Sequence, residues 1–181
     1  MQYSHHPLPH DYSNIVGKRD NFTLVIVDKD PFPSSPTGIP FCKGSWEEQL
    51  KANNSGLYVL KSIGIDVQNA ETSYPDPSSL FHDLVSQGIV FLNCSYHFLD
   101  TTGLPKKDHT YVDQALPINE PIIRKATNVL LCGEAKILEE KIKNVNFFKI
   151  VHPDIQNRSL RASDWNKWWA DNSIKQYFNL S

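Results

Sequence analysis

Short apolar runs alternate with more polar, helix-like segments along this chain. Four runs read as buried strands, over residues 22–27, 89–92, 129–132 and 147–151. Such unbroken apolar character is typical of strands covered on both faces. The alternation predicts an α/β fold, a three-layer sandwich with a central, mostly parallel four-stranded sheet flanked by helices.

The segments between the strands carry recognisable helix signals. Ser45-Trp46-Glu47-Glu48 has the pattern of a capping box and predicts a helix that breaks near 53–56. Further helices are expected at 57–64, 80–87, 122–126, 135–142 and 164–177, with loops over 69–79 and 99–119. Residues 1–21 show little periodicity and predict a loose N-terminal arm, followed by a single domain over 22–181.

Composition narrows the class of protein. The net charge of −2 is small, but residues 1–120 hold 8 Lys and Arg against 14 Asp and Glu, whereas residues 121–181 hold 10 against 6. The basic C-terminal part is either a docking face for nucleic acid or a solvated surface. No run approaches the ~20 apolar residues of a membrane span, and the N-terminus has no apolar signal core, so we expect a cytoplasmic protein.

The three cysteines are widely spaced and odd in number. Cys42, Cys94 and Cys132 form no CxxC pair, which argues against a disulfide framework or a zinc site. We expect buried free thiols.

Polar residues stand where the apolar runs end. Asp30-Pro31 follows the first run, Asn93 ends the second, and His152-Pro153 follows the last. In a parallel sheet these ends meet in the crevice where such sheets bind ligands. An Asp and a His brought together there can perform acid, base or electrostatic chemistry. Taken singly, Asp30 is more often a turn residue and His152 a strand-end residue than a catalytic one, and Asn93 is also typical of a helix cap.

An ordered set of motifs resembles a known family. Its members in this sequence are Asp30-Pro31-Phe32, Gly38-Ile39-Pro40-Phe41, Gln87-Gly88-Ile89-Val90-Phe91-Leu92-Asn93, Leu130-Leu131-Cys132-Gly133-Glu134-Ala135 and His152-Pro153. In order and spacing they resemble the uracil-DNA glycosylases, most closely the first family of that superfamily, over roughly residues 22–175.

The resemblance implies that the domain flips a uracil out of DNA and hydrolyses its N-glycosidic bond. Asp30 would stabilise the positively charged sugar and orient the attacking water. His152 would donate to the base oxygen as negative charge develops there. No metal or cofactor is implied. DNA, single- or double-stranded, is the implied partner of a monomeric enzyme, which would lie at the nucleoid if the source is prokaryotic.

The same resemblance implies a base pocket. Asn93 would read the base edge, Phe41 would stack on the base, and Phe32 would close its C5 edge. Lys29, next to Asp30, would complete the base-binding residues.

The chain departs from the family motifs at five positions. Asp28 replaces a Gly, Lys29 a Gln, Phe32 a Tyr, Pro33 a His and Asp154 a Ser. A carboxylate at 154 would repel a DNA phosphate, so the DNA contact would pass to Asn157, Arg158 and Ser159. Ile155 or Leu160 would supply the apolar wedge that fills the vacated base stack.

These departures leave three functions open. Uracil excision is the first. The second is excision of another modified or damaged base, because the pocket walls differ. The third is a catalytically silent module that binds DNA or a protein. A nucleoside hydrolase is disfavoured, since Asp28 and Asp30 alone make a thin metal-binding cluster.

Overall fold

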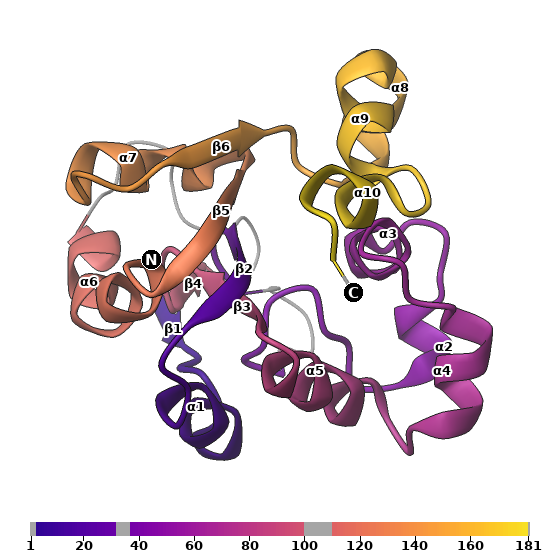
Figure 1. The fold of residues 1–181 in the computed structure, drawn as a ribbon, viewed down its shortest axis with the longest axis horizontal. Helices are drawn as coiled ribbons and strands as arrows, with labels where there is room; N and C mark the ends of the chain where they lie inside the picture. The colour runs from indigo at the N-terminus through magenta and orange to yellow at the C-terminus, as the bar shows by residue number, and fades with distance from the viewer. Residues whose placement is uncertain (1–2, 32–36, 100–109, 181) are drawn as a thin grey trace.

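A four-stranded parallel sheet forms the centre of the computed structural model, which describes residues 3–31, 37–99 and 110–180 (Figure 1). Its strands are β2 (Phe22–Asp28), β3 (Ile89–Asn93), β5 (Ala126–Cys132) and β6 (Phe147–Ile150). They lie in the order β3-β2-β5-β6, and each neighbouring pair is parallel. The predicted α/β sandwich is therefore confirmed.

Burial explains why these segments are strands. Residues 24–27 of β2 and 90–92 of β3 are fully buried, as expected for apolar strands covered on both faces. The register pairs Asp28 with Asn93 at the ends of β2 and β3. Two polar side chains thus leave the sheet side by side at its carboxyl edge.

Helices cover both faces of the sheet. Their bounds are α1 His10–Gly17, α2 Trp46–Gln49, α3 Ser55–Ser62, α4 Val67–Ser73, α5 Pro77–Ser86, α6 Thr110–Ile123, α7 Leu138–Lys141, α8 Ile155–Leu160, α9 Ala162–Trp169 and α10 Ser173–Phe178, with a 3-10 turn η1 at Gly133–Ile137. Figure 1 shows α6 and α7 on one side of the sheet and α3, α9 and α10 on the other. Among the described residues, no helix combines the length and apolarity that crossing a membrane requires.

Several local signals in the sequence are confirmed. The Ser45 side chain accepts from the backbone N–H of Glu48 and caps α2. The cysteines at 42, 94 and 132 are buried and free, and burial raises the pKa of the Cys42 thiol to about 12.

The two expected loops were partly wrong. Helix α4, capped by Asp66, occupies the start of the 69–79 segment. Helix α6 begins at Thr110 and continues through Pro117 and Pro121. Burial of an apolar face, including Val112, stabilises α6 beyond what its sequence propensity allows. The rest of the predicted 99–119 loop, residues 100–109, lies outside the described part of the chain.

The tail forms two helices rather than the single one expected. Asn172 adopts a left-handed conformation, with φ of 63°, between α9 and α10. This turns the chain, so that α10 packs back on α9 and α3.

The N-terminal segment is not a loose arm in the structure. Strand β1 (Tyr3–His5) pairs antiparallel with β4 (His97–Leu99), and α1 packs on α5. Tyr12 of α1 is fully buried. Its hydroxyl accepts from the backbone N–H of Phe91 at 2.9 Å and lies 3.3 Å from the Phe91 carbonyl oxygen. Tyr12 and Val16 are the buried residues of α1, and two positions i and i+4 in a short helix are too few to stand out as a periodic pattern in the sequence.

Replacing Tyr12 by Phe tests the anchor. Because the change leaves the backbone N–H of Phe91 buried without its acceptor, we expect it to lower the free energy of unfolding by about 1–3 kcal/mol. Urea denaturation measures the loss. Tyr177→Phe, at a half-exposed position, is the matched control. Equal stability of the two variants would contradict the anchoring role of α1.

Candidate active site at the carboxyl edge of the sheet

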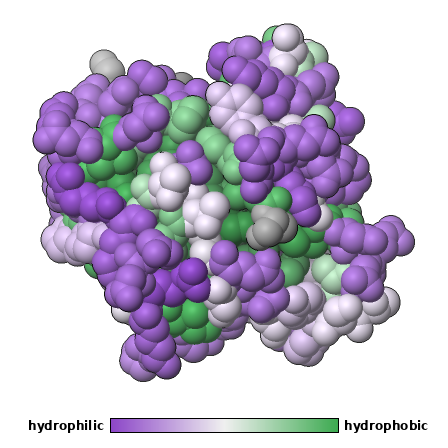
Figure 2. Space-filling view, in the orientation of Figure 1, coloured by the Kyte–Doolittle hydropathy of each residue, from purple (hydrophilic) through white to green (hydrophobic). Residues whose placement is uncertain are grey.

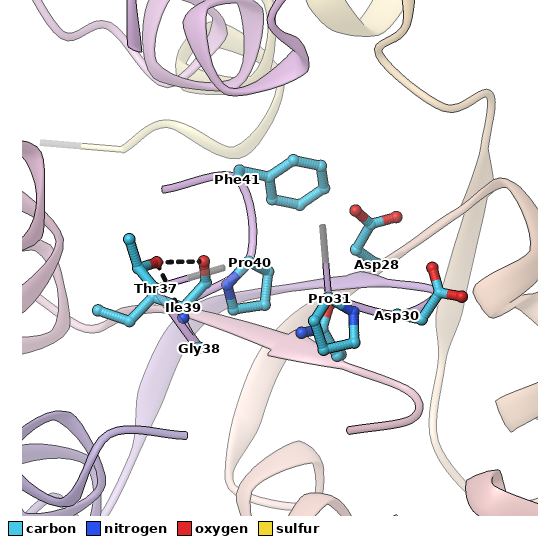
Figure 3. A pocket seen from close by; sticks show the side chains of 9 residues that line it. Asp28, Asp30, Pro31, Thr37, Gly38, Ile39, Pro40 and Phe41 are labelled. Carbon is cyan, nitrogen blue, oxygen red and sulfur yellow. Dashed lines mark hydrogen bonds between the residues drawn. The ribbon is translucent and has the colours of Figure 1, made fainter. Parts of the chain in front are cut away.

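A small pocket lies where β2 and β3 end (Figure 3). Its lining residues are Asp28, Asp30, Pro31, Thr37, Gly38, Ile39, Pro40, Phe41 and Asn93. Three of the residues predicted for the site, Asp30, Asn93 and Phe41, therefore line one pocket. Its free volume is about 10 Å³, the room of roughly one water molecule, so a larger ligand would have to part its walls.

Asn93 is the pocket residue whose buried polar atoms lack hydrogen bonds to the described residues. Its side chain is buried, with the residue 1% exposed, and neither its amide nitrogen nor its amide oxygen has a hydrogen-bond partner among the described residues. An unpaired buried amide costs free energy, and a ligand in the pocket would satisfy it. The backbone carbonyl of Asn93 accepts from the Asn119 side chain at 2.8 Å, and Tyr96 donates to the Asn119 oxygen at 2.8 Å.

Asp28 is the site residue that the motif-based assignment missed. Its Oδ1 lies 3.2 Å from Nε2 of His152 and accepts from the Lys29 backbone N–H at 2.8 Å. The sequence signal was present, because a carboxylate closes a buried apolar strand. The resemblance drew attention to Asp30 instead, and His152 contacts Asp28.

His152 lies between two carboxylates. Its Nδ1 is 3.0 Å from Oδ2 of Asp154, on the side opposite Asp28. Burial lowers the pKa of His152, but the charges and hydrogen bonds of Asp28 and Asp154 outweigh it and raise the pKa to about 10. The imidazole is therefore protonated at neutral pH, with both nitrogens engaged.

Asp154, which replaces a Ser of the family motif, has a structural role that the sequence comparison did not suggest. It caps α8 by accepting from the backbone N–H of Asn157 at 2.6 Å. Burial raises the pKa of Asp154, but the hydrogen bonds from His152 and Asn157 outweigh this effect, so the pKa lies below its ordinary value. The same carboxylate thus orients His152 and begins α8.

Phe41 is held in an unusual backbone conformation. Its φ is 64°, a left-handed value that few side chains of this size adopt. The Gln49 side chain donates to its carbonyl oxygen at 3.1 Å, and a Cβ on Gly56 would collide with that oxygen. The ring is fully buried, with its centroid 6.2 Å from that of His152. Strain held in this way is common at functional sites.

Lys29 and Asp30 form an ion pair beside the pocket. The Lys29 Nζ is 3.7 Å from Asp30 Oδ2, and both side chains are largely buried. The cation offsets part of the charge on the carboxylate predicted to be catalytic. Phe32, also expected in the pocket, lies outside the described residues.

A wider cleft of about 560 Å³ opens on the other side of His152. It is lined by His152 and Asn157, by the cations Lys136, Lys149, Arg161 and Lys167, and by the acids Glu134 and Asp164. Glu139 pairs with Lys149 and Asp164 with Arg161. Four cations at one cleft could hold phosphate groups.

Helix α8 carries the remaining predicted residues. Arg158 donates to the Tyr58 hydroxyl at 3.0 Å and lies over the Tyr58 and Trp165 rings, whereas Ser159 donates to the backbone of its own helix. Ile155 and Leu160 are 50% and 82% exposed. Figure 2 shows a mostly hydrophilic surface over α8 and α9, with a small apolar area at the outer end of α8.

Comparisons with known proteins define the fold. No family model matches the chain. The structure resembles the wild-type UNG, a uracil-DNA glycosylase, from Nitratifractor salsuginis, with a TM-score of 0.54 over 94% of this chain and 78% of that one, at 13% identity. The fold is therefore like that of a uracil-DNA glycosylase.

A curated sequence also matches part of the chain. It is the probable ATP-dependent RNA helicase spindle-E of Drosophila sechellia, 25% identical over 118 residues. The match takes in 59% of this chain and only 8% of the length of that protein.

The protonated His152 makes stability depend on pH. Its folded pKa of about 10 exceeds the ordinary 6.5, so its contribution is present below pH 6.5 and is lost as the pH rises to about 10. We expect wild type to lose a few kcal/mol more than His152→Gln across this range, since the variant lacks the titrating group. Urea denaturation at pH 6, 8 and 10 measures both. Parallel curves for the two proteins would refute the assignment.

Proposed function

We propose that this protein is a DNA glycosylase that hydrolyses the N-glycosidic bond of a flipped-out base. The observation that carries the proposal is Asn93, whose buried, unpaired amide lines the same pocket as two carboxylates and an aromatic ring. The glycosylase-like fold supports it. Uracil is the base that the motif resemblance implies.

The reaction needs only water and the side chains of the site. The C1′–N bond breaks and its electron pair leaves with the base, while a water oxygen bonds to C1′ and gives up its proton. Asp30 stabilises the positive sugar and accepts that proton. Asn93 hydrogen-bonds the base edge and Phe41 stacks on its face.

His152 acts through charge rather than as a free donor. Both its nitrogens contact carboxylates, so it would have to leave Asp28 to donate to the base. As an imidazolium between Asp28 and Asp154, it offsets part of the negative charge of these two carboxylates beside the pocket. Asp28 and Asp154 are then positioning residues for His152.

The wide cleft is the proposed path of the DNA backbone. Lys136, Lys149, Arg161 and Lys167 would face phosphates, with Asn157 adding an amide. Leu160 or Ile155, both exposed on α8, would enter the base stack in place of the flipped nucleotide. Arg158 and Ser159 are the other proposed contacts with the backbone.

Base release tests the proposal directly. Labelled oligonucleotides, each with one uracil or another altered base, are incubated with the protein and then cleaved with alkali. We expect alkali-labile sites with wild type and a rate at least ~100-fold lower with Asp30→Asn, the usual effect of removing one charge-stabilising group.

Asp171→Asn is the matched control, because its carboxylate is exposed and its ion-pair partner within the described part of the chain is Lys61. It should cleave like wild type. Cleavage by Asp30→Asn at the wild-type rate would reject Asp30 as the catalytic group. If wild type released none of the bases in the set, the proposal that the protein is a glycosylase would be rejected.

The salt dependence of DNA affinity tests whether the cations of the wide cleft contact DNA phosphates. Lys136→Ala with Lys167→Ala removes two cations that face it, so DNA affinity should fall and the slope of log affinity against log salt should shrink by roughly 1.4–1.8. Fluorescence anisotropy at several salt concentrations measures both. Lys18→Ala, on the segment after α1, is the control. An unchanged slope in the double variant would place the DNA elsewhere.

A catalytically silent nucleic-acid-binding module is the second candidate. It is favoured by the engagement of both His152 nitrogens and by the Lys29 ion pair on Asp30. The sequence match to a protein named as an RNA helicase agrees with a nucleic-acid partner for either function. A silent module would show salt-dependent binding and no released base.

A further inference from the structure

Acceptors outnumber donors among the unpaired polar atoms of the described pocket residues: the Asn93 amide supplies one NH2 group and one oxygen, and Asp28 adds a carboxylate oxygen. Asp28 Oδ1 is occupied by His152 and the Lys29 backbone, whereas its Oδ2 has no partner within the described part of the chain. Asp28 and Asn93 are register partners on adjacent strands, so this oxygen and the unpaired Asn93 amide line the same end of the pocket. Figure 3 shows the Asp28 carboxylate on the side of the Phe41 ring.

The charged residues in the described lining of the pocket are both acidic. Two carboxylates, Asp28 and Asp30, line it, and Asp154 lies behind His152. Lys29 and His152 are the cations in contact with these acids in the described residues. Of these five charged residues, only the carboxylates of Asp28 and Asp30 are among the residues that line the pocket.

This arrangement opposes the excision of uracil. Uracil presents two carbonyl oxygens and leaves as an anion, so Asp28 would repel it both in the ground state and as the bond breaks. A base that is positively charged before cleavage behaves in the opposite way. It leaves neutral, and an amino group on its edge would donate to Asp28.

We propose that the pocket selects a cationic, amino-bearing base, such as one alkylated on a ring nitrogen, over uracil, with Asp28 as the specificity-determining residue. The proposal rests on the glycosylase function proposed above and names its substrate class. In the reaction, the electron pair of the C1′–N bond neutralises the base, water supplies the hydroxyl to C1′, and the released proton passes through Asp30 to solvent.

Two single-stranded oligonucleotides test the selection, one with a single 3-methylcytosine and one with a single uracil. The two bases are similar in size, but only 3-methylcytosine carries a positive charge and an amino group in place of the second carbonyl. Single strands remove differences in base pairing. We expect wild type to release 3-methylcytosine at least ~10-fold faster than uracil.

Asp28→Asn keeps the shape of the side chain and replaces one acceptor by a donor. We expect it to lower the ratio of 3-methylcytosine to uracil release at least ~10-fold, whereas Asp171→Asn leaves the ratio unchanged. Uracil release by wild type that equals or exceeds release of 3-methylcytosine would overturn the proposal, and this outcome needs no variant to fold.

Measuring the affinity for the two oligonucleotides distinguishes failure of the proposed base selection from failure of the proposed glycosylase activity. If wild type releases neither base, the glycosylase function fails, and selection is read from the affinities of the two oligonucleotides. Tighter binding of the 3-methylcytosine strand that disappears in Asp28→Asn would still support recognition by Asp28. Equal affinities would overturn it.

Discussion

The contact between Asp28 and His152 joins the parts of the site that are furthest apart in the sequence. Asp28 ends β2, and His152 follows β6, two strands away across the sheet. Because the imidazole also contacts Asp154, the contact fixes the start of α8 and therefore the wall of the wide cleft. The pocket and the cleft both depend on this one charged pair.

The charged pair stands beside a pocket whose polar groups are incompletely satisfied. Buried amides are nearly always hydrogen-bonded in native proteins, so the unpaired Asn93 is a departure with a cost. The left-handed backbone of Phe41 adds strain at the same place. The surrounding sheet, with its fully buried inner strands, supplies the stability that holds both.

The strength of the resemblance differs between the fold and the chemistry. The backbone aligns with a uracil-DNA glycosylase over nearly the whole chain, but at an identity that defines fold alone. The charged side chains at the site differ from the motifs that this sequence resembles, through Asp28, Lys29 and Asp154. One fold can host sites of different chemistry, so function is argued from these side chains and not from the scaffold.

The sequence by itself determined the strands, because each is a continuous apolar run. The logic of parallel sheets predicted Asp30, Asn93 and His152 at one edge, where Asp30 and Asn93 line the pocket and His152 contacts Asp28. It did not determine α1, α4 or α6, whose short or proline-containing segments become helical through burial against the rest of the protein. Only the tertiary structure decided that His152 contacts Asp28, because that contact depends on the order of the strands across the sheet and on the turn after β6. A contact between two charged residues far apart in the sequence produces no local pattern from which it could be predicted.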